Sequence, residues 1–528
     1  MPAAMPDTTD PTPHADPHRL EAQRRANRDA IAALGVDPFG GRADGLIALA
    51  EAVRRYDPDA DAAFKEHGKE PGFTDPRPVV AVAGRVMLHR DNGKLVWLNL
   101  RDGTGDLQVA VSRRECDETG FNLAKLCDLG DWVIARGPLV RTRTGEITVW
   151  ASSLSMGVKS LAPPPEKWSG LADPELRYRR RSVDLYTNPA VMRVFRLRSA
   201  IVARIRRFFD ERGFLEVETP VLQPRPGGAA ARPFRSHLHA LDMPVVLRIA
   251  TELHLKRLLV GGMGRVYEMG RIFRNEGLDR QHNPEFTSIE VYQSFGDCWT
   301  MLDHTEALLR DLAHYVAVTT ADPNVEPEDI DPASVRLPFD DVEIDFGSPF
   351  ARVTYSDLFE KALGFSMTDA ARARQEAAHR GLKHEGLADA LVVNELFEAV
   401  AEPTIDPARP TFVTDYPAAI SPLTRALTDD PTLAGRWDLF IGGMEIGTAY
   451  TELNDPDAQV ARFTEQLAGA DEEERAFRTL DQDFIAALKV GMPPAGGLGL
   501  GVDRMVMLLT GQRSIRDVIL FPFMRPVD

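Results

Sequence analysis

The sequence contains little cysteine and has no long apolar run. Its 528 residues include three cysteines, Cys116, Cys127 and Cys298, too few and too scattered for a disulfide framework or a zinc site, so we expect free thiols. The N-terminal stretch MPAAMPDTTDPTPHADPH lacks the apolar core of a secretory signal, and no later segment approaches the roughly 20 apolar residues that span a bilayer. We therefore expect a cytoplasmic protein without a membrane segment.

Basic residues are also fewer than acidic residues. The chain has 62 Lys and Arg against 79 Asp and Glu, a formal net charge of -17, which argues against coating nucleic acid by bulk electrostatics. Between Pro78 and Trp150 the balance differs, with ten Lys and Arg against nine Asp and Glu. This segment is one place where a nucleic-acid surface is expected.

Several motifs of phosphate and zinc chemistry are absent. The sequence contains no P-loop, no kinase glycine-rich loop with its HRD segment and no HExxH. It also shows no internal repeat. These absences exclude the P-loop NTPases, the protein kinases and the HExxH zinc proteases.

Composition and turn signals divide the chain into several regions. Its length and its 44% apolar residues suffice for more than one domain with its own core. The expected regions are a disordered tail over 1–17, a helical extension over 18–76, a small β domain over 77–160, a linker or hinge over 161–187 and a large domain over 188–528 with an acidic insertion near 321–334.

The segment 77–160 reads as a series of short strands. Turn residues separate the runs VVAVAGRVML, LVWLNLRD, LQVAV, WVIARGPLV and ITVWASSL, and one helical insert is expected from Phe121 to Cys127. Five short strands with such turns are typical of a small closed barrel of the OB type.

The large domain begins with a helix signal. Asn188 and Pro189 suit an N-cap and a first helical turn, and apolar residues at helical spacing follow until Gly213. A strand, FLEVETPVL, then ends at Pro220. Further β-like runs alternate irregularly with helices, which predicts an α+β domain around an antiparallel sheet.

The stretch FRNEGLDRQHNPEFTSIEVY predicts a charged hairpin. Alternation in its second strand places Phe286, Ser288, Glu290 and Tyr292 on one face and Thr287, Ile289 and Val291 on the other. The apolar face should pack against helices. The polar face is either solvated or lines a pocket.

Two further segments favour the pocket. GLGLGVDRMVMLLTG has glycines that allow close approach to the backbone, followed by Arg504 in the first turn of a helix. DLFIGGMEIGTAYTELND places Asp438, Glu445 and Glu452 in an apolar, strand-like setting, where carboxylates need a metal, a cation or hydrogen-bond donors. Arginines for phosphate and acids for magnesium indicate phosphoryl or nucleotidyl transfer.

Strict alternation does not bring all these acids together. It groups Thr448, Tyr450 and Glu452 on one face but leaves Glu445 on the other. One site that contains both glutamates therefore requires an irregularity, expected near Gly443 or Gly447.

Taken in order, these segments resemble the three signature motifs of the class II aminoacyl-tRNA synthetases. The runs PGGAAARPF, RIATELHLKRLLVGG, FRNEG followed by HNPEFT, and TELNDP are similar to those of class II lysyl-tRNA synthetases, and the resemblance extends from about residue 19 to the end. It implies an OB-fold anticodon-binding domain before a class II catalytic domain. It also implies a homodimer that uses ATP with Mg²⁺ to activate L-lysine and transfers lysine to the 3′ end of tRNA(Lys).

The resemblance also implies roles for individual residues. Arg274 would hold the ATP α-phosphate and the substrate carboxylate, and Arg504 would lie on the γ-phosphate side, while Glu276, His282 and Phe286 would bind adenine. Magnesium would be held by Asp438 and Glu445. Lysine would be bound by Gly228, Glu252, Glu290, Tyr292, Thr448, Tyr450 and Glu452, and the anticodon by Arg90, Trp97, Gln108 and Glu146.

Two positions depart from the family pattern. Thr448 stands where many relatives carry Asn, and Trp97 replaces a more familiar Phe. Alternation alone leaves open whether Trp97 belongs to the barrel core or to a surface that stacks on a base.

The acidic pocket can be argued from chemistry as well. A lysine ammonium is a point charge with three donors, so a selective pocket needs acceptors and negative charge at depth, as Glu290 and Glu452 would supply. The alternatives are an aspartyl or asparaginyl type of synthetase, a paralogue that modifies a protein, and an RNA-binding regulator. The glutamate-rich pocket argues against an aspartyl or asparaginyl type. The complete barrel argues against a protein-modifying paralogue, and the retained arginines argue against an RNA-binding regulator.

Overall fold

The computed structural model describes residues 17–165, 171, 173–229, 231–322, 325–468 and 481–527. Residues 1–16 of the expected tail lie outside this description, as do 166–170 and 172 of the expected linker and 323–324 of the acidic stretch. The chain forms two compact units, Met1–Met192 and Arg193–Asp528. Among the described residues no helix is both long enough and apolar enough to cross a membrane.

The first unit contains a closed five-stranded barrel. Its strands pair in the cyclic order β1-β2-β3-β5-β4, because β1 pairs with both β2 and β4, and β6 is added beside β4. The six strands are β1 (Val79–Asp91), β2 (Leu95–Arg101), β3 (Asp106–Ser112), β4 (Trp132–Arg141), β5 (Ile147–Ala151) and β6 (Ser153–Val158). This confirms the OB-type barrel, with the last run expected from the sequence divided between β5 and β6.

Helices cover this barrel. The expected insert is α4 (Glu118–Leu126), and the N-terminal region forms α1 (Pro17–Ala33), α2 (Leu49–Arg54) and α3 (Pro58–His67). Ile31 of α1 and Leu49 of α2 belong to the same buried cluster as the barrel strands, so the extension completes the barrel core. The segment expected as a linker contains two short helices, α5 (Pro174–Arg179) and α6 (Arg181–Thr187).

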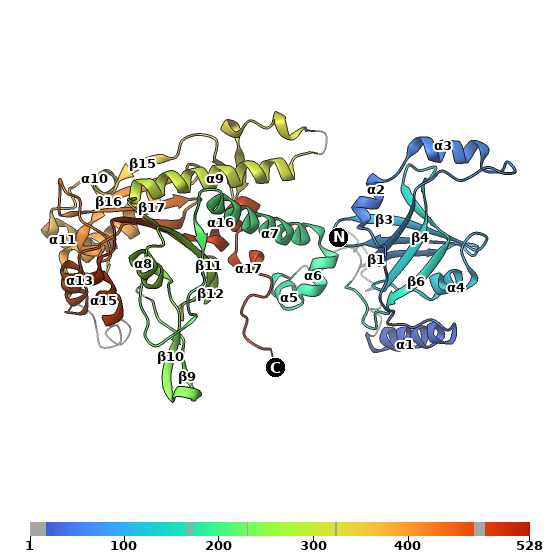
Figure 1. Ribbon diagram of the computed structural model, residues 1–528, viewed down its shortest axis with the longest axis horizontal. Coiled ribbons are helices and arrows are strands. Elements are labelled where there is room, and N and C mark those ends of the chain that lie inside the picture. The colour runs from blue at the N-terminus through green and yellow to red at the C-terminus, as the bar shows by residue number, and fades with distance from the viewer. Residues whose placement is uncertain are drawn as a thin grey trace, which may run out of the picture. The chain divides into compact units, whose positions relative to one another are not determined.

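The second unit is built around an eight-stranded sheet in the order β15-β16-β17-β18-β19-β12-β11-β7 (Figure 1). All pairings from β16 to β11 are antiparallel, and the two edge strands are parallel to their neighbours. The strands are β7 (Leu215–Glu216), β11 (Arg265–Phe273), β12 (Glu285–Ser294), β15 (Ala351–Thr354), β16 (Thr411–Pro417), β17 (Leu433–Ile441), β18 (Met444–Thr451) and β19 (Ala495–Gly501). The antiparallel α+β architecture is confirmed, although β7 is much shorter than the expected strand.

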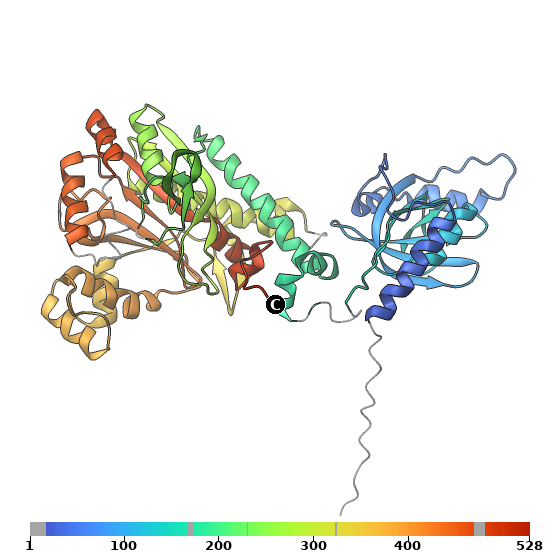
Figure 2. The ribbon, with the colours of Figure 1, turned by 90° about the horizontal axis from the view of Figure 1, so that it is seen from below.

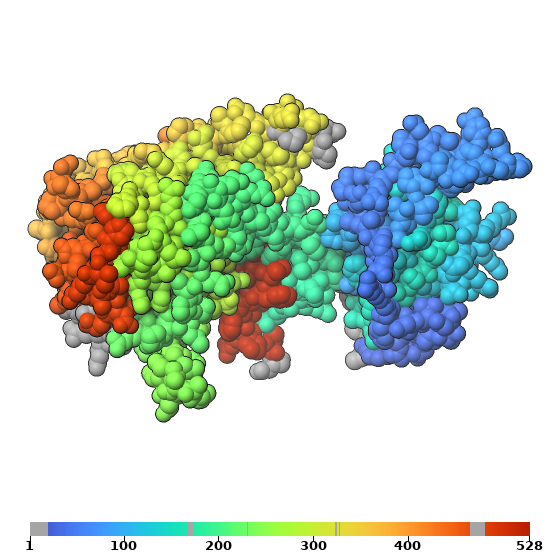
Figure 3. All heavy atoms as spheres, viewed as in Figure 1, coloured from blue at the N-terminus to red at the C-terminus, as the bar shows by residue number. Residues whose placement is uncertain are grey.

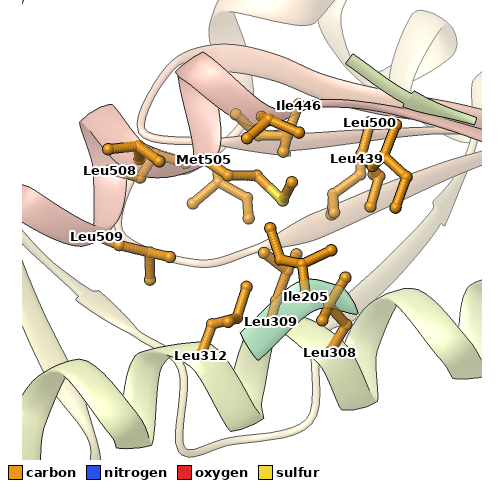
Figure 4. Close-up of a cluster of buried hydrophobic side chains, with 14 of the residues drawn as sticks. Ile205, Leu308, Leu309, Leu312, Leu439, Ile446, Leu500, Met505, Leu508 and Leu509 are labelled. Atoms are coloured by element: carbon orange, nitrogen blue, oxygen red, sulfur yellow. The ribbon is translucent and has the colours of Figure 1, made fainter. Parts of the chain in front are cut away.

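Three helices cover one face of this sheet. They are α7 (Pro189–Asp210), α9 (Cys298–Thr320) and α16 (Val502–Thr510). Figure 4 shows their apolar side chains pointing toward one another and toward the strands, among them Ile205, Leu309 and Met505, which are fully buried or nearly so. This core fixes one face of the sheet and leaves the other face available for a site.

Further helices complete the second unit. Helices α10 (Tyr355–Leu363), α11 (Ala370–His379) and α12 (Asp389–Leu396) gather at the end of the sheet near β15 (Figure 2). The remaining helices are α8 (Glu252–Val260), α13 (Pro456–Ala468), α15 (Gln482–Gly491) and α17 (Ile515–Val518). Two small sheets complete the unit: a three-stranded sheet in the order β8 (Leu222–Gln223), β10 (Met243–Leu247) and β9 (Arg235–Leu238), and a pair made of β13 (Arg336–Phe339) and β14 (Val342–Asp345). Figure 3 shows β9 and the turn after it as a lobe that projects from the unit.

The charged hairpin has the expected form. Strands β11 and β12 pair in regular antiparallel register, from Phe273 opposite Glu285 to Arg265 opposite Gln293. Ile289 and Val291 are fully buried in the core, whereas Glu290 keeps partial exposure. The polar face of β12 therefore lies on the side of the sheet away from α7, α9 and α16.

Candidate active site

A cavity of about 740 Å³ lies over the polar face of the sheet. Its wall includes parts of α8, β12, β18 and β19 and of the loop between β11 and β12. The predicted residues that line it are Gly228, Glu252, Arg274, Glu276, His282, Phe286, Glu290, Tyr292, Glu445, Thr448, Tyr450 and Arg504. The structure thus brings twelve of the predicted residues together, while Asp438 and Glu452 lie behind the wall.

A β-bulge places Glu445 on the cavity side. Leu439 of β17 faces Gly447, but the next residue, Phe440, faces Glu445, so Ile446 is the extra residue on β18. Ile446 is buried in the core and its neighbour Glu445 lines the cavity. This is the irregularity that alternation required, and it lies next to Gly447.

Two arginines stand in the cavity wall. Arg274 follows β11, its guanidinium lies 5.4 Å from the Phe286 ring centroid, and its Nε is buried without a hydrogen-bond partner among the described residues. Arg504 donates from Nη1 to the backbone oxygen of Glu445 at 2.6 Å and contacts His282 Nε2 from Nη2 at 2.9 Å. Since Nε2 accepts that bond, the His282 ring donates from Nδ1 to Asp279. The unpaired donor of Arg274 suits an anionic ligand.

Carboxylates form another part of the wall. Glu290 Oε1 accepts the backbone N–H of Thr251 at 2.9 Å, and Tyr292 donates its hydroxyl to Oε2 at 3.3 Å. Burial, with the nearby charge of Glu252, raises the pKa of Glu290 to about 7 although these bonds favour the charged form. A cationic ligand would relieve this cost.

Glu452 lies beneath this wall and is 1% exposed. Its Oε2 lies 2.5 Å from the Nζ of Lys256, which also donates to Oε1 of Glu252 at 2.5 Å. Gly497 of β19 makes room for the Glu452 carboxylate, because a Cβ there would come within 1.8 Å of Oε1. In the structure Glu452 forms a buried ion pair and is not among the residues that line the cavity, and its contact with lysine stays a prediction.

Asp438 is also paired within the protein. It is 4% exposed, and Arg436 holds both its oxygens, with Nε to Oδ1 at 3.1 Å and Nη2 to Oδ2 at 2.6 Å. The Arg436 guanidinium lies over the rings of Tyr416 and Tyr450, at 4.2 and 5.8 Å from their centroids. Asp438 could reach a metal ion in the cavity only by leaving this pairing.

The donors still suit a magnesium ion that is carried by a polyphosphate. Desolvation, followed by the charge of Asp438, raises the pKa of Glu445, so a nearby cation would stabilise its ionised form. No three His, Cys, Asp or Glu side chains converge as a metal cage in the described part of the chain. Magnesium commonly binds through one or two carboxylates and substrate phosphates, which is the donor set available here.

Gly228 supplies a tight turn in the cavity wall. Its φ of +83° lies in the left-handed region, and a Cβ would meet those of Ala250 and Glu252 at 3.0 and 3.3 Å. Its backbone is consequently open to the cavity beside the Glu252 carboxylate.

The barrel carries a separate polar face in the first unit. Arg90 is paired with Trp97 across β1 and β2, and Gln108 lies on β3 opposite Asn99. Val96 and Leu98 are fully buried and Trp97 is not, so the tryptophan belongs to the outer face rather than to the barrel core.

The outer face of the barrel also carries further polar and aromatic side chains. Thr148 donates to Gln108 Oε1 at 2.9 Å, and Glu146 is exposed just before β5. The rings of Trp97 and Trp150 meet edge to face at 6.2 Å. Trp150 Nε1 and Asn99 Oδ1 are buried without a hydrogen-bond partner in the ranges that the structure covers. These groups offer stacking and hydrogen bonding to a nucleobase.

Sequence reasoning missed several residues of these two sites. Lys256 follows Glu252 by four residues on α8, and that helical spacing was a usable signal. Arg436 and Asp438 share one face of β17 by alternation. For Asn99 and Trp150 the same period of two on the barrel strands could have indicated the outer face.

Comparison with known proteins agrees with this geometry. The family described as class II tRNA synthetases (D, K and N) matches residues 173–525, and an OB-fold nucleic acid binding domain matches residues 80–156. A lysine–tRNA ligase of Carboxydothermus hydrogenoformans is 41% identical over 98% of this chain and 100% of its own length. Two further lysine–tRNA ligases are similar, from Synechococcus sp. RCC307 (45% identical, 89% of this chain and 92% of the relative) and Anaeromyxobacter sp. strain K (44%, 96% and 98%). The chain therefore belongs to the class II tRNA synthetases, in the family of the lysine–tRNA ligases.

Proposed function

We propose that this chain activates L-lysine with ATP to lysyl-adenylate and transfers the lysine to the 3′ end of tRNA(Lys) in the cytoplasm. One observation carries the proposal: a single cavity joins arginines suited to phosphate with carboxylates suited to ammonium groups. The alternatives left open by the sequence find no support, because the similar proteins above are named as lysine–tRNA ligases.

Lysine recognition would depend on the acidic wall. Glu290, oriented by Thr251 and Tyr292, would accept the side-chain ammonium. Glu252 and the backbone at Gly228 would hold the α-ammonium, while Thr448 and Tyr450 would line the cavity beside it. Such a site rejects an analogue that lacks the amine by roughly 10⁴-fold, because its own carboxylates would lose their partner.

The first reaction step would use the arginine wall. The lysine carboxylate attacks the α-phosphate of ATP in line, the bond to the β-phosphate breaks and pyrophosphate leaves. Arg274 would hold the substrate carboxylate and the α-phosphate, and Arg504 the γ-phosphate, so catalysis follows from positioning and charge stabilisation. Phe286 would stack on the adenine, with Glu276 and His282 at its edge.

Magnesium would enter with ATP. Glu445, and Asp438 if Arg436 releases it, would hold the ion. When bound, the ion would neutralise charge on the phosphates.

In the second step the terminal ribose hydroxyl of tRNA attacks the adenylate carbonyl, and AMP leaves. The outer barrel face would read the anticodon: Trp97 would stack on a base, and Arg90, Gln108 and Glu146 would contact base edges and backbone.

We further propose a homodimer that forms through α7. A second hollow of about 400 Å³ is lined by this helix together with parts of β11, β12 and Leu520. Beyond Leu520, Phe521 and Phe523 are 75% and 66% exposed, more than is usual for phenylalanine. Sedimentation should give twice the mass of one chain, and a monomer at working concentration would contradict the proposal.

The function is tested by charging purified tRNA with radiolabelled amino acids. We expect lysine to be attached to tRNA(Lys) and aspartate not to be attached to tRNA(Asp). Charging of tRNA(Asp) with aspartate, or transfer of lysine to protein without tRNA, would overturn the proposal.

A further inference from the structure

Lys256 is a fully buried lysine beside the proposed amino-acid pocket. Its side chain is 0% exposed, and its Nζ lies 2.5 Å from Glu252 Oε1 and 2.5 Å from Glu452 Oε2. The ammonium also lies 6.0 Å from the centre of the Phe484 ring on α15. Helices α8 and α15 and the residue that directly follows β18 therefore enclose one cation.

This lysine changes the charge of the site. Three carboxylates surround the acidic end of the cavity: Glu252, Glu290 and Glu452. Lys256 compensates one of them, and the nearby Arg436 and Asp438 compensate each other. Two negative charges remain on these three acids, and L-lysine brings two ammonium groups.

The position of the triad is specified by the fold. Gly497, opposite Tyr292 on β12 and Tyr450 on β18, is the residue whose missing side chain leaves space for the Glu452 carboxylate. Lys256 reaches both acids from one helix, since Glu252 is four residues earlier on α8. Lys256 is a buried cation with two carboxylate partners, and a glycine leaves the space that one of these carboxylates occupies. The arrangement is therefore a specific feature of the core and not a surface ion pair.

We propose that Lys256 is a positioning residue for substrate selection: its ammonium bridges and orients Glu252 and Glu452 and compensates one of their charges, so that the three acids Glu252, Glu290 and Glu452 match a substrate with two ammonium groups. This inference rests on the proposed function and adds a residue that does not itself contact the substrate.

The electrostatics of the surroundings agree with this role. Burial lowers the pKa of Lys256, but the two carboxylates outweigh burial, so the pKa stays above its usual range and the cation persists. Burial raises the pKa of Glu452, and Lys256 opposes that effect, whereas Glu252 and Glu290 add to it. Without Lys256 the pKa of Glu452 would lie higher still, because burial and the charges of Glu252 and Glu290 would act on it unopposed.

The test compares three variants in lysine-dependent ATP–pyrophosphate exchange between pH 6 and 8.5. Lys256→Met removes the cation with little change of shape. Lys256→Met combined with Glu452→Gln removes the cation and one acid, and so restores two net negative charges. Lys159→Met is the matched control, because Lys159 is equally buried and also bridges two acids, Asp128 and Asp131, in the other unit.

We expect Lys256→Met to raise KM for lysine about 100-fold, with kcat within about 5-fold of wild type. The midpoint of its KM profile should also move up by at least about one pH unit. The double variant should return KM to within about 10-fold of wild type. Lys159→Met should lower the thermal unfolding temperature without moving the lysine KM or its pH midpoint.

Two results would overturn the inference. One is an unchanged KM and pH midpoint in Lys256→Met; the other is a double variant as impaired as the single one, which would indicate that Lys256 serves packing alone. If Lys256→Met does not fold, the double variant decides by the same KM criterion. Failure of the proposed function is distinct, since the wild-type protein would then show no lysine-dependent exchange.

Discussion

Glu290→Gln removes one negative charge from the pocket and keeps the shape of the side chain. The glutamine carbonyl can still accept the Thr251 N–H, which Glu290 accepts at 2.9 Å, so the fold should persist. A substrate ammonium would lose its ionised partner. Truncating one side of a buried charged pair costs about 2–5 kcal/mol, which corresponds to a loss of about 30-fold to several thousand-fold in kcat/KM for lysine.

The same substitution should change the pH dependence. The pKa of Glu290 is raised to about 7, first by burial and then by the charge of Glu252. A bound ammonium favours the ionised form, so KM for wild type should be level above pH 7 and should rise as pH falls below 7, by up to about tenfold per unit. Glutamine does not titrate, so this slope should disappear in the variant.

Stability should change in the opposite direction to activity. Because the folded pKa lies above the ordinary value of 4.5, the native state binds more protons, and stability falls as pH rises from about 4.5 to 7. At pH 8 Glu290→Gln should therefore raise the free energy of unfolding by on the order of 1–3 kcal/mol, reduced by the partial exposure of the side chain.

The assay is lysine-dependent ATP–pyrophosphate exchange from pH 6 to 8.5, together with urea unfolding at pH 8. Glu343→Gln on β14 is the control, because that carboxylate is exposed on a strand outside the cavity and should change neither measurement. A Glu290→Gln enzyme that keeps wild-type lysine selectivity and the wild-type pH slope would refute the role of Glu290 as the ammonium acceptor.

Three other substitutions test other parts of the account. Arg504→Gln should lower kcat of exchange by about 10²–10³-fold with little effect on stability, measured at saturating lysine and ATP, and an unchanged kcat would exclude Arg504 from charge stabilisation. Gly497→Ala should raise KM for lysine by about 5- to 150-fold, because its Cβ would come within 1.8 Å of Glu452 Oε1 and force that side chain to move; a crystal structure with Glu452 unmoved would contradict this. Trp97→Ala should raise KM for tRNA by about 5- to 150-fold in charging assays and leave exchange unaltered, whereas an altered exchange rate would disagree with a role confined to the anticodon.

Local patterns predicted much of the fold. The helical spacing after Asn188 predicted α7, and the alternation around Glu290 predicted the hairpin of β11 and β12. Turn signals predicted the barrel strands. These features depend on residues that are close together in the sequence. The side-chain periods of 3.6 residues in a helix and 2 residues in a strand therefore predict them directly.

The remaining features depend on distant parts of the chain. The pairing of Lys256 with Glu452 joins residues far apart in sequence, and it forms only because the fold brings α8 close to the segment that follows β18. Arg436, which pairs with Asp438, also lies over the rings of Tyr416 and Tyr450, and Tyr416 comes from the neighbouring strand β16. Alternation could require a bulge but could not place it at Ile446, because the register of β17 and β18 decides which residue is extra.

The most direct test of the central claim is ATP–pyrophosphate exchange by the wild-type protein with each of the twenty amino acids in turn. The acidic pocket predicts strong exchange with lysine and none above background with aspartate, whose side chain the carboxylates would repel. Exchange that depends on aspartate and not on lysine would contradict the account.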